Sequence, residues 1–189
     1  MIRAFIAVEL TSSARREIHR LQTKLQEADA DVKWVNPNQL HLTLKFLGNI
    51  EETQIHSLEE ALAETLHKFS PFSLQIEGLG AFPKTTAPRV LWVGVSTGEQ
   101  ELVALAGAAE KACQALRFEP EERPFRGHLT IGRIRSGKQL ASLVQLLEGI
   151  KFKGSVLSPI EKVILFQSTL SPSEPTYKRL AEIPLVSSK

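Results

Sequence analysis

Two short segments of the sequence combine a histidine with a threonine two residues later. The sequence HLTL at 41–44 recurs as HLTI at 128–131. Because side chains alternate between the two faces of a β-strand, each histidine would share a face with its threonine, while the aliphatic residues would point the other way. The pattern therefore predicts two strands that each present an imidazole and a hydroxyl side by side.

His41, His128, Thr43 and Thr130 together suit the hydrolysis of a phosphodiester. An imidazole has an ordinary pKa near ~6.5, so two histidines can hold opposite protonation states near neutral pH. A neutral histidine can then take a proton from water while a protonated one gives a proton to the leaving oxygen. The threonine hydroxyls can donate hydrogen bonds to the non-bridging oxygens of a phosphate. This chemistry needs neither a covalent intermediate nor a metal.

The other candidate residues point to ordinary roles. His19, His56 and His67 lie in predicted helices beside charged residues, which favours solvent-exposed positions. The sequence has no His-Glu-x-x-His, Cys-x-x-Cys or Asp-rich motif, and its glycines do not form a phosphate-binding loop. We therefore expect no metal and no cofactor.

The elements that must position these residues are alternating short strands and amphipathic helices. A helix capped by Thr11 or Ser12 is predicted to follow the first strand, and 51–69 is predicted as a second helix with acidic residues in its first turn. Gly48 and Asn49 are predicted to end the strand of the first motif. The predicted strands are 2–8, 32–35, 40–47, 72–76, 89–95, 127–134, 152–156, 162–168 and an edge strand at 177–183; the remaining helices are 99–116 and 138–148, with a long connection at 77–88, a loop at 171–175 and a frayed end at 187–189.

The composition is that of an ordinary globular protein. The chain has 189 residues, 42% of them hydrophobic and 23% charged, with a net charge of +2. This length fits one domain or two lobes that share one fold, and the small net charge argues against tight, sequence-independent binding of duplex nucleic acid. The single cysteine, Cys113, cannot form an internal disulfide, no apolar run approaches the ~18 residues of a membrane span, and the first residues do not form a signal peptide. We expect a cytoplasmic protein with no membrane association.

Around the two motifs, the sequence resembles the two-histidine (2H) phosphoesterase superfamily and specifically its LigT-like branch, the RNA 2′,3′-cyclic phosphodiesterases historically named 2′-5′ RNA ligases. The matching stretches run in order over nearly the whole chain. They are 3–7, 34–35, 41–48, 89–94, 123–133 and 177–180. One His-x-Thr motif is unspecific, but this ordered set is highly specific.

The resemblance implies an α+β, bilobal LigT-like fold in which residues 1–189 form a single domain. Two pseudo-symmetric lobes would each carry an antiparallel sheet backed by helices, with the active cleft between them. It also implies hydrolysis of RNA 2′,3′-cyclic phosphate ends, or of cyclic nucleotides, to 2′-phosphomonoesters. His41 maps to the proton donor and His128 to the proton acceptor, while Thr43 and Thr130 map to phosphate binding. No coiled-coil or apolar surface stripe demands an oligomer, so we expect a monomer.

Phe46 and Arg133 each lie five residues after their histidine, at positions that the family uses near the nucleotide base. Strict alternation conflicts with this role, because an odd spacing places both residues on the core-facing side. Phe46 could then be a plain core residue. Arg133 could be a solvated strand end, or a bulge at Gly132 could direct it toward phosphate or base. Many relatives have proline where this chain has Gly127, which could loosen the entry to the second strand.

Two alternatives to hydrolysis stay open at this stage. The same proton transfers run backwards when a 5′-hydroxyl replaces water, so the chain could be a reversible 2′-5′ RNA ligase that acts on tRNA halves. It could also be a non-catalytic module that binds nucleotide or RNA. The two complete His-x-Thr pairs favour an enzyme, because binding alone does not need two proton-transfer groups.

Overall fold

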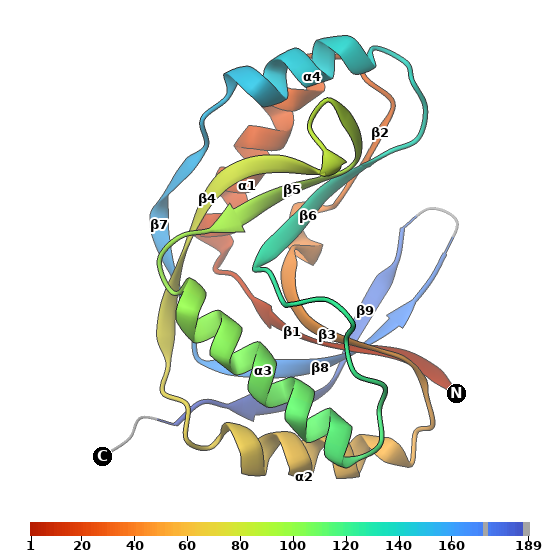
Figure 1. Ribbon diagram of the computed structural model, residues 1–189, viewed down its shortest axis with the longest axis vertical. Coiled ribbons are helices and arrows are strands. Elements are labelled where there is room, and N and C mark those ends of the chain that lie inside the picture. The colour runs from red at the N-terminus through yellow and green to blue at the C-terminus, as the bar shows by residue number, and fades with distance from the viewer. Residues whose placement is uncertain (172–173, 187–189) are drawn as a thin grey trace.

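The chain folds into two antiparallel β-sheets with helices packed on them (Figure 1). The computed structural model describes residues 1–171 and 174–186. The first sheet has the order β3-β1-β8-β9 and the second has the order β2-β6-β5-β4-β7. The strands are β1 (Ile2–Glu9), β2 (Val32–Trp34), β3 (His41–Ile50), β4 (Phe72–Lys84), β5 (Ala87–Val95), β6 (His128–Ile134), β7 (Lys153–Ile160), β8 (Lys162–Thr169) and β9 (Thr176–Pro184). The helices are α1 (Ser12–Gln26), α2 (Gln54–Leu66), α3 (Glu99–Ala115) and α4 (Leu140–Gly149), with a 3-10 turn at Pro37–Gln39.

The two lobes are interleaved along the chain rather than built from successive halves. Helices α2 and α3 contact each other and pack on the first sheet, whereas α1 contacts β7 and α4 on the second. Figure 1 shows this division, with α4 at the top of the molecule and α2 at the bottom. The α+β, bilobal expectation is therefore confirmed, but the chain passes from one lobe to the other several times.

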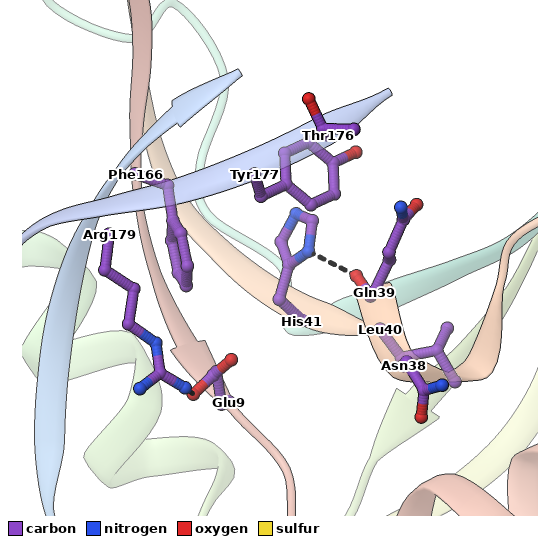
Figure 2. Close-up of a pocket in the computed structure, with 9 residues that line it drawn as sticks. All are labelled: Glu9, Asn38, Gln39, Leu40, His41, Phe166, Thr176, Tyr177 and Arg179. Atoms are coloured by element: carbon purple, nitrogen blue, oxygen red, sulfur yellow. Dashed lines mark hydrogen bonds and ion pairs between the residues drawn. The ribbon is translucent and has the colours of Figure 1, made fainter. Parts of the chain in front are cut away.

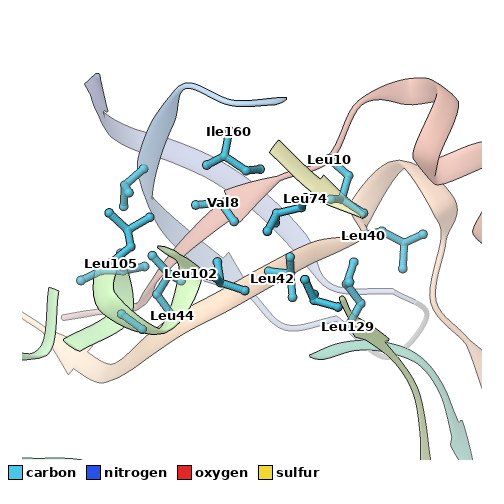
Figure 3. Packing of buried hydrophobic residues seen from close by; sticks show 14 of the residues in the cluster. Val8, Leu10, Leu40, Leu42, Leu44, Leu74, Leu102, Leu105, Leu129 and Ile160 are labelled. Carbon is cyan, nitrogen blue, oxygen red and sulfur yellow. The ribbon is translucent and has the colours of Figure 1, made fainter. Parts of the chain in front are cut away.

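One hydrophobic core extends through both lobes. Leu42 and Leu44 of β3 are buried in the same cluster as Leu129 and Ile131 of β6. Figure 3 shows leucines of β3, β6 and α3 side by side in this cluster. The aliphatic residues of both motifs thus anchor their strands from behind, as alternation predicts.

The helix termini follow the sequence signals at α1 but not at α2. The Thr11 side chain accepts a hydrogen bond from the backbone N–H of Ala14 at 3.3 Å, which caps α1. The expected acidic first turn of α2 is wrong, because this helix begins only at Gln54. Glu51 lies before it and donates its backbone N–H to the Gln54 side chain at 2.9 Å.

The segment predicted as a long connection is instead part of a β-hairpin. Strand β4 continues to Lys84 and pairs with β5 over most of its length. Gly80 allows this pairing because the Trp92 indole lies only 2.3 Å from where a Cβ would stand. Gly78 adopts a φ of +86° at an irregularity of the ladder. The glycines that suggested a loop therefore lie within a strand, where Gly80 serves close packing and Gly78 a positive φ.

Two further predictions concern strand ends. Strand β3 does not stop at Gly48 and Asn49 but continues to Ile50, with Gly48 at a φ of +72°. Strand β9 is an edge strand, as predicted. The predicted loop at 171–175 falls partly, and the frayed end at 187–189 wholly, outside the described residues. Across residues 1–171 and 174–186, no helix has the length and apolar character that a membrane span requires.

Candidate active site

The two His-x-Thr motifs lie on β3 and β6, which contact each other across the two sheets. On both strands the histidine and threonine are half-buried and the residue after each is buried. The pairs that sequence analysis predicted are therefore His41 with Thr43 on the first sheet and His128 with Thr130 on the second. We call the surfaces that carry these pairs the His–Thr faces.

Each catalytic candidate histidine is held by a backbone carbonyl two residues upstream. The His41 Nδ1 lies 2.7 Å from the Gln39 carbonyl oxygen, and the His128 Nδ1 lies 2.8 Å from that of Arg126. A carbonyl only accepts hydrogen bonds, so Nδ1 must carry the proton in both rings. The Nε2 atom of each ring is therefore the one available for proton transfer.

His41 sits among aromatic rings that sequence analysis did not assign to the site. Phe5 stacks on its ring at a centroid distance of 4.8 Å, and Tyr177 meets it edge-on at 5.1 Å. Burial lowers the pKa of His41 below its ordinary value of 6.5, although the Gln39 carbonyl and the charge of Glu9 oppose this effect. Without a ligand, His41 is thus easier to deprotonate than an exposed histidine.

His128 has an aromatic neighbourhood of its own on the second sheet. Phe82 meets its ring edge-on at 5.2 Å, and Trp92 lies 5.4 Å from Phe82. Phe82 falls in the segment predicted as a connection, so its place beside His128 was missed. Phe82 and Gly80 are two residues apart and therefore share one face of β4. This strand pattern could have located Phe82, but the prolines at 83 and 88 favoured a loop instead.

A bulge in β3 decides the orientation of Phe46. Thr43 pairs with Ala7 and Lys45 with Ile6, which leaves Leu44 as an extra residue on β3. Lys45 and Phe46, which follow the bulge, therefore exchange faces. Phe46 is 61% exposed and its ring lies 6.2 Å from that of Phe5, beside His41. The core position that strict alternation favours for Phe46 is wrong.

A bulge also occurs at the equivalent position of β6. Thr130 pairs with Trp92 and Gly132 with Leu91, so Ile131 is the extra residue. The bulge lies one residue before the position that sequence analysis considered. It places Arg133 on the His–Thr face of the second sheet, where the side chain is exposed.

The bulge in β3 also turns Lys45 into the protein, although strict alternation would put it on the same face as His41 and Thr43. Lys45 is only 2% exposed, and its Nζ donates hydrogen bonds to Glu110 at 2.7 Å and to the Glu119 carbonyl at 2.9 Å. Burial opposes the ionisation of Glu110, but the hydrogen bond and charge of Lys45 lower its pKa. Lys45 thereby ties β3 to α3 and to the loop that leads to His128.

Replacing Lys45 with alanine is expected to destabilise the chain by about 2 kcal/mol, since it leaves a partly buried carboxylate without its partner. Urea unfolding measures this change. The matched control is Lys153→Ala, which removes an exposed ion pair with Glu77 and should cost less than ~1 kcal/mol. Equal stability of the two variants would contradict the role assigned to Lys45.

Gly127, which stands where many relatives have proline, has a packing role that the sequence alone does not indicate. A Cβ at this position would lie 2.9 Å from the Leu102 side chain of α3. Glycine therefore lets the entry to β6 lie directly against this helix.

A cavity of about 370 Å³ opens beside His41 on the first lobe. Figure 2 shows the His41 ring between Tyr177 and Gln39, with Glu9 and Arg179 in contact at the far wall. The Arg179 guanidinium lies 2.6 Å from the Glu9 carboxylate. The cavity residues are Glu9, Asn38, Gln39, Leu40, His41, Phe166, Thr176, Tyr177 and Arg179.

The remaining histidines lie where sequence analysis placed them. His19, His56 and His67 are all exposed on or at the end of helices, and His56 pairs with Glu60 at 3.3 Å. Within the part of the chain that the structure describes, no three His, Cys, Asp or Glu side chains are grouped so as to hold a metal ion.

Comparison with known proteins relates this geometry to one family. The family model described as LigT like Phosphoesterase matches residues 8–92 and again residues 93–177. The boundary between the two matches falls inside β5, so the sequence repeat does not coincide with the two lobes.

Curated relatives and solved structures match over nearly the full chain. An RNA 2′,3′-cyclic phosphodiesterase of Methanothermobacter thermautotrophicus is 36% identical over 179 residues, which cover 93% of this chain and 95% of the relative. A relative of the same name from Archaeoglobus fulgidus is also 36% identical and covers 95% and 98%. A solved structure from Thermus thermophilus superposes with a TM-score of 0.81 at 26% identity, covering 97% of this chain and 98% of that one. Apo LigT of E. coli gives 0.78 at 21% identity, covering 98% of each chain. By the two family matches and these relatives, the chain belongs to the LigT-like phosphoesterases.

Proposed function

We propose that this chain hydrolyses RNA 2′,3′-cyclic phosphate ends to 2′-phosphomonoesters by metal-independent acid–base catalysis. The observation that carries the proposal is the pair of imidazoles on contacting strands, each with Nδ1 held by a carbonyl and Nε2 left for proton transfer. The relatives named RNA 2′,3′-cyclic phosphodiesterase support the substrate class. The continuous core supports one bilobal domain over residues 1–189, which we propose acts as a monomer.

In the proposed mechanism, His128 is the proton acceptor and His41 the proton donor. The Nε2 of His128 takes a proton from water as the water oxygen bonds to phosphorus. The bond from phosphorus to the 3′ oxygen breaks, and that oxygen takes the proton from Nε2 of His41. Exchange of protons with solvent then restores both rings.

Four further side chains complete the proposed site. The hydroxyls of Thr43 and Thr130 donate to the non-bridging phosphate oxygens, whose charge grows in the transition state. Phe46 and Arg133 are proposed to lie near the terminal base and phosphate, because both bulges direct them to the His–Thr faces.

The lowered pKa of His41 predicts a specific pH dependence. His41 must be protonated to act as the acid, and in the free protein it loses its proton below the ordinary value of 6.5. The alkaline limb of kcat/KM, which reports the free enzyme, should therefore lie below that value. A bound phosphate anion raises the pKa of His41, so the alkaline limb of kcat should lie at higher pH.

Steady-state kinetics over pH 4–9 measure both limbs. Glu9→Gln serves as the diagnostic variant, because the Glu9 charge raises the pKa of His41 and its loss should move the kcat/KM limb further down. A kcat/KM limb above that of kcat would contradict the assignment of His41 as the acid.

Product analysis of a defined RNA tests the function itself. A short RNA with a 2′,3′-cyclic phosphate end is incubated with the chain in EDTA, and the end is identified by phosphorus NMR. The proposal expects a 2′-phosphate. A 3′-phosphate or no turnover would overturn it, and joined strands in the presence of a 5′-hydroxyl RNA would instead indicate ligation.

A further inference from the structure

The first sheet continues beyond His41 as an aromatic surface that ends at an arginine. Phe5, Ala7, Ile164 and Phe166 form a buried cluster separate from the main core, with Tyr177 packed against it. We call this group the aromatic platform. It lies on the His–Thr face, because Phe5 and Tyr177 both contact the His41 ring.

Arg3 lies at the end of this platform and on the same face. It is two residues before Phe5 on β1, and it pairs with Ser168, which in turn pairs with Tyr177. Residues that pair directly across a sheet share a face. Arg3, Ser168 and Tyr177 therefore form a row across three neighbouring strands.

The order of residues along β1 matches the order of groups in one nucleotide. Thr43, the proposed ligand of the terminal phosphate, is opposite Ala7, and the exposed Phe46 is opposite Phe5. Arg3 follows four residues beyond Ala7, about 13 Å along the strand. An extended arginine side chain and one nucleoside together bridge this span.

The charges of three side chains act on the Tyr177 hydroxyl. Burial raises the pKa of Tyr177; the positive charges of Arg133 and Arg3 oppose this rise, while the negative charge of Glu174 adds to it. Arg3 and Arg133 are exposed, and within residues 1–171 and 174–186 neither has a carboxylate within 4.0 Å. Arg179 differs, because Glu9 and Glu182 neutralise it.

We propose that Arg3 and the Tyr177 hydroxyl bind the phosphate on the 5′ side of the terminal nucleotide. Guanidinium groups bind phosphate through paired, charge-assisted hydrogen bonds, and a phenol adds a neutral donor. The site makes a 5′-phosphorylated or oligonucleotide end a better substrate than a cyclic mononucleoside phosphate. The inference rests on the proposed function, because the terminal phosphate must lie between the two His–Thr faces.

The test compares adenosine 2′,3′-cyclic phosphate with and without a 5′-phosphate. The wild-type chain should show a kcat/KM about tenfold higher for the 5′-phosphorylated form, the effect of one charged hydrogen-bond pair. Arg3→Ala should reduce this ratio to about twofold, with Arg3→Lys in between. Tyr177→Phe should lower the ratio while keeping the ring against His41 and Phe5.

Lys178→Ala is the matched control. Lys178 carries the same charge as Arg3 and is exposed on β9 next to Tyr177, but its side chain points to the opposite face of the sheet. This variant should keep the wild-type ratio. A wild-type ratio near one, or an Arg3→Ala variant that lowers kcat/KM equally for both substrates, would overturn the subsite.

Equilibrium binding separates a failure of the subsite from a failure of the proposed function. Adenosine 2′-phosphate and adenosine 2′,5′-bisphosphate are titrated into wild type and Arg3→Ala by calorimetry. If neither cyclic substrate turns over, the proposed function fails, while tighter binding of the bisphosphate that Arg3→Ala abolishes would still support the subsite. Equal binding of the two ligands by wild type would overturn the subsite independently.

Discussion

His41→Ala and His128→Ala are each expected to lower kcat for a cyclic-phosphate RNA end by about 10²–10⁴-fold, the contribution of one positioned acid or base. Each substitution removes a ring whose Nδ1 is held by a carbonyl and whose Nε2 carries the proton transfer in the proposed mechanism. KM should change much less than kcat, because the threonines and arginines remain. Single-turnover kinetics with a defined cyclic-phosphate oligonucleotide measure the chemical step directly.

The double variant sharpens this expectation. Residues that act in one concerted step show strongly non-additive effects, so His41→Ala with His128→Ala should be little slower than the worse single variant. His19→Ala is the control, because this histidine is exposed on α1 and should be replaceable without loss. Wild-type rates in either single variant would refute the two-histidine mechanism.

Thr43→Val and Thr130→Val should each lower kcat by about 10²-fold, the cost of removing one preorganised donor to a developing oxyanion. Valine keeps the shape of threonine, and both side chains are only half-buried, so the fold should be retained. The proposed loss is therefore that of a hydrogen bond to phosphate rather than of packing.

Serine provides the rescue for this second experiment. Thr43→Ser and Thr130→Ser keep the hydroxyl and should recover most of the activity, whereas the valine variants should not. Circular dichroism and a thermal unfolding curve check that all four variants are folded. A serine variant as slow as its valine counterpart would show that the methyl group, and not the donor, is what the site needs.

Much of the architecture could be predicted from short-range patterns in the sequence. Thr11 offers its hydroxyl to a free N–H three residues on, and Leu42, Leu44, Leu129 and Ile131 alternate with polar partners. Each of these signals acts within one element, where the period of the helix or strand decides which face is buried. The α+β class and the two His–Thr pairs were accessible for this reason.

Features that depend on a neighbouring strand could not be predicted from the sequence. A bulge exists only relative to the neighbouring ladder, so nothing local to Leu44 marks it as the extra residue that exposes Phe46 and buries Lys45. In the sequence, Gly80 indicates a loop. Only the structure shows that the Trp92 side chain of β5 occupies the space that a Cβ at this position would need. The carbonyls of Gln39 and Arg126 belong to the backbone and leave no trace in the pattern of side chains.

The two bulges also give the site a direction. They occur at matching places on β3 and β6, yet they present different groups, an apolar ring at Phe46 and a cation at Arg133. A site with true twofold symmetry would accept a nucleic-acid strand equally well in either orientation. Here the two ends differ chemically, so under the proposed function an RNA strand is expected to find a favourable partner in one polarity only. In the proposed mechanism the duplicated scaffold thus supplies the proton-transfer pair, and the unequal residues beyond each bulge would distinguish the 5′ side of the RNA from its 3′ side.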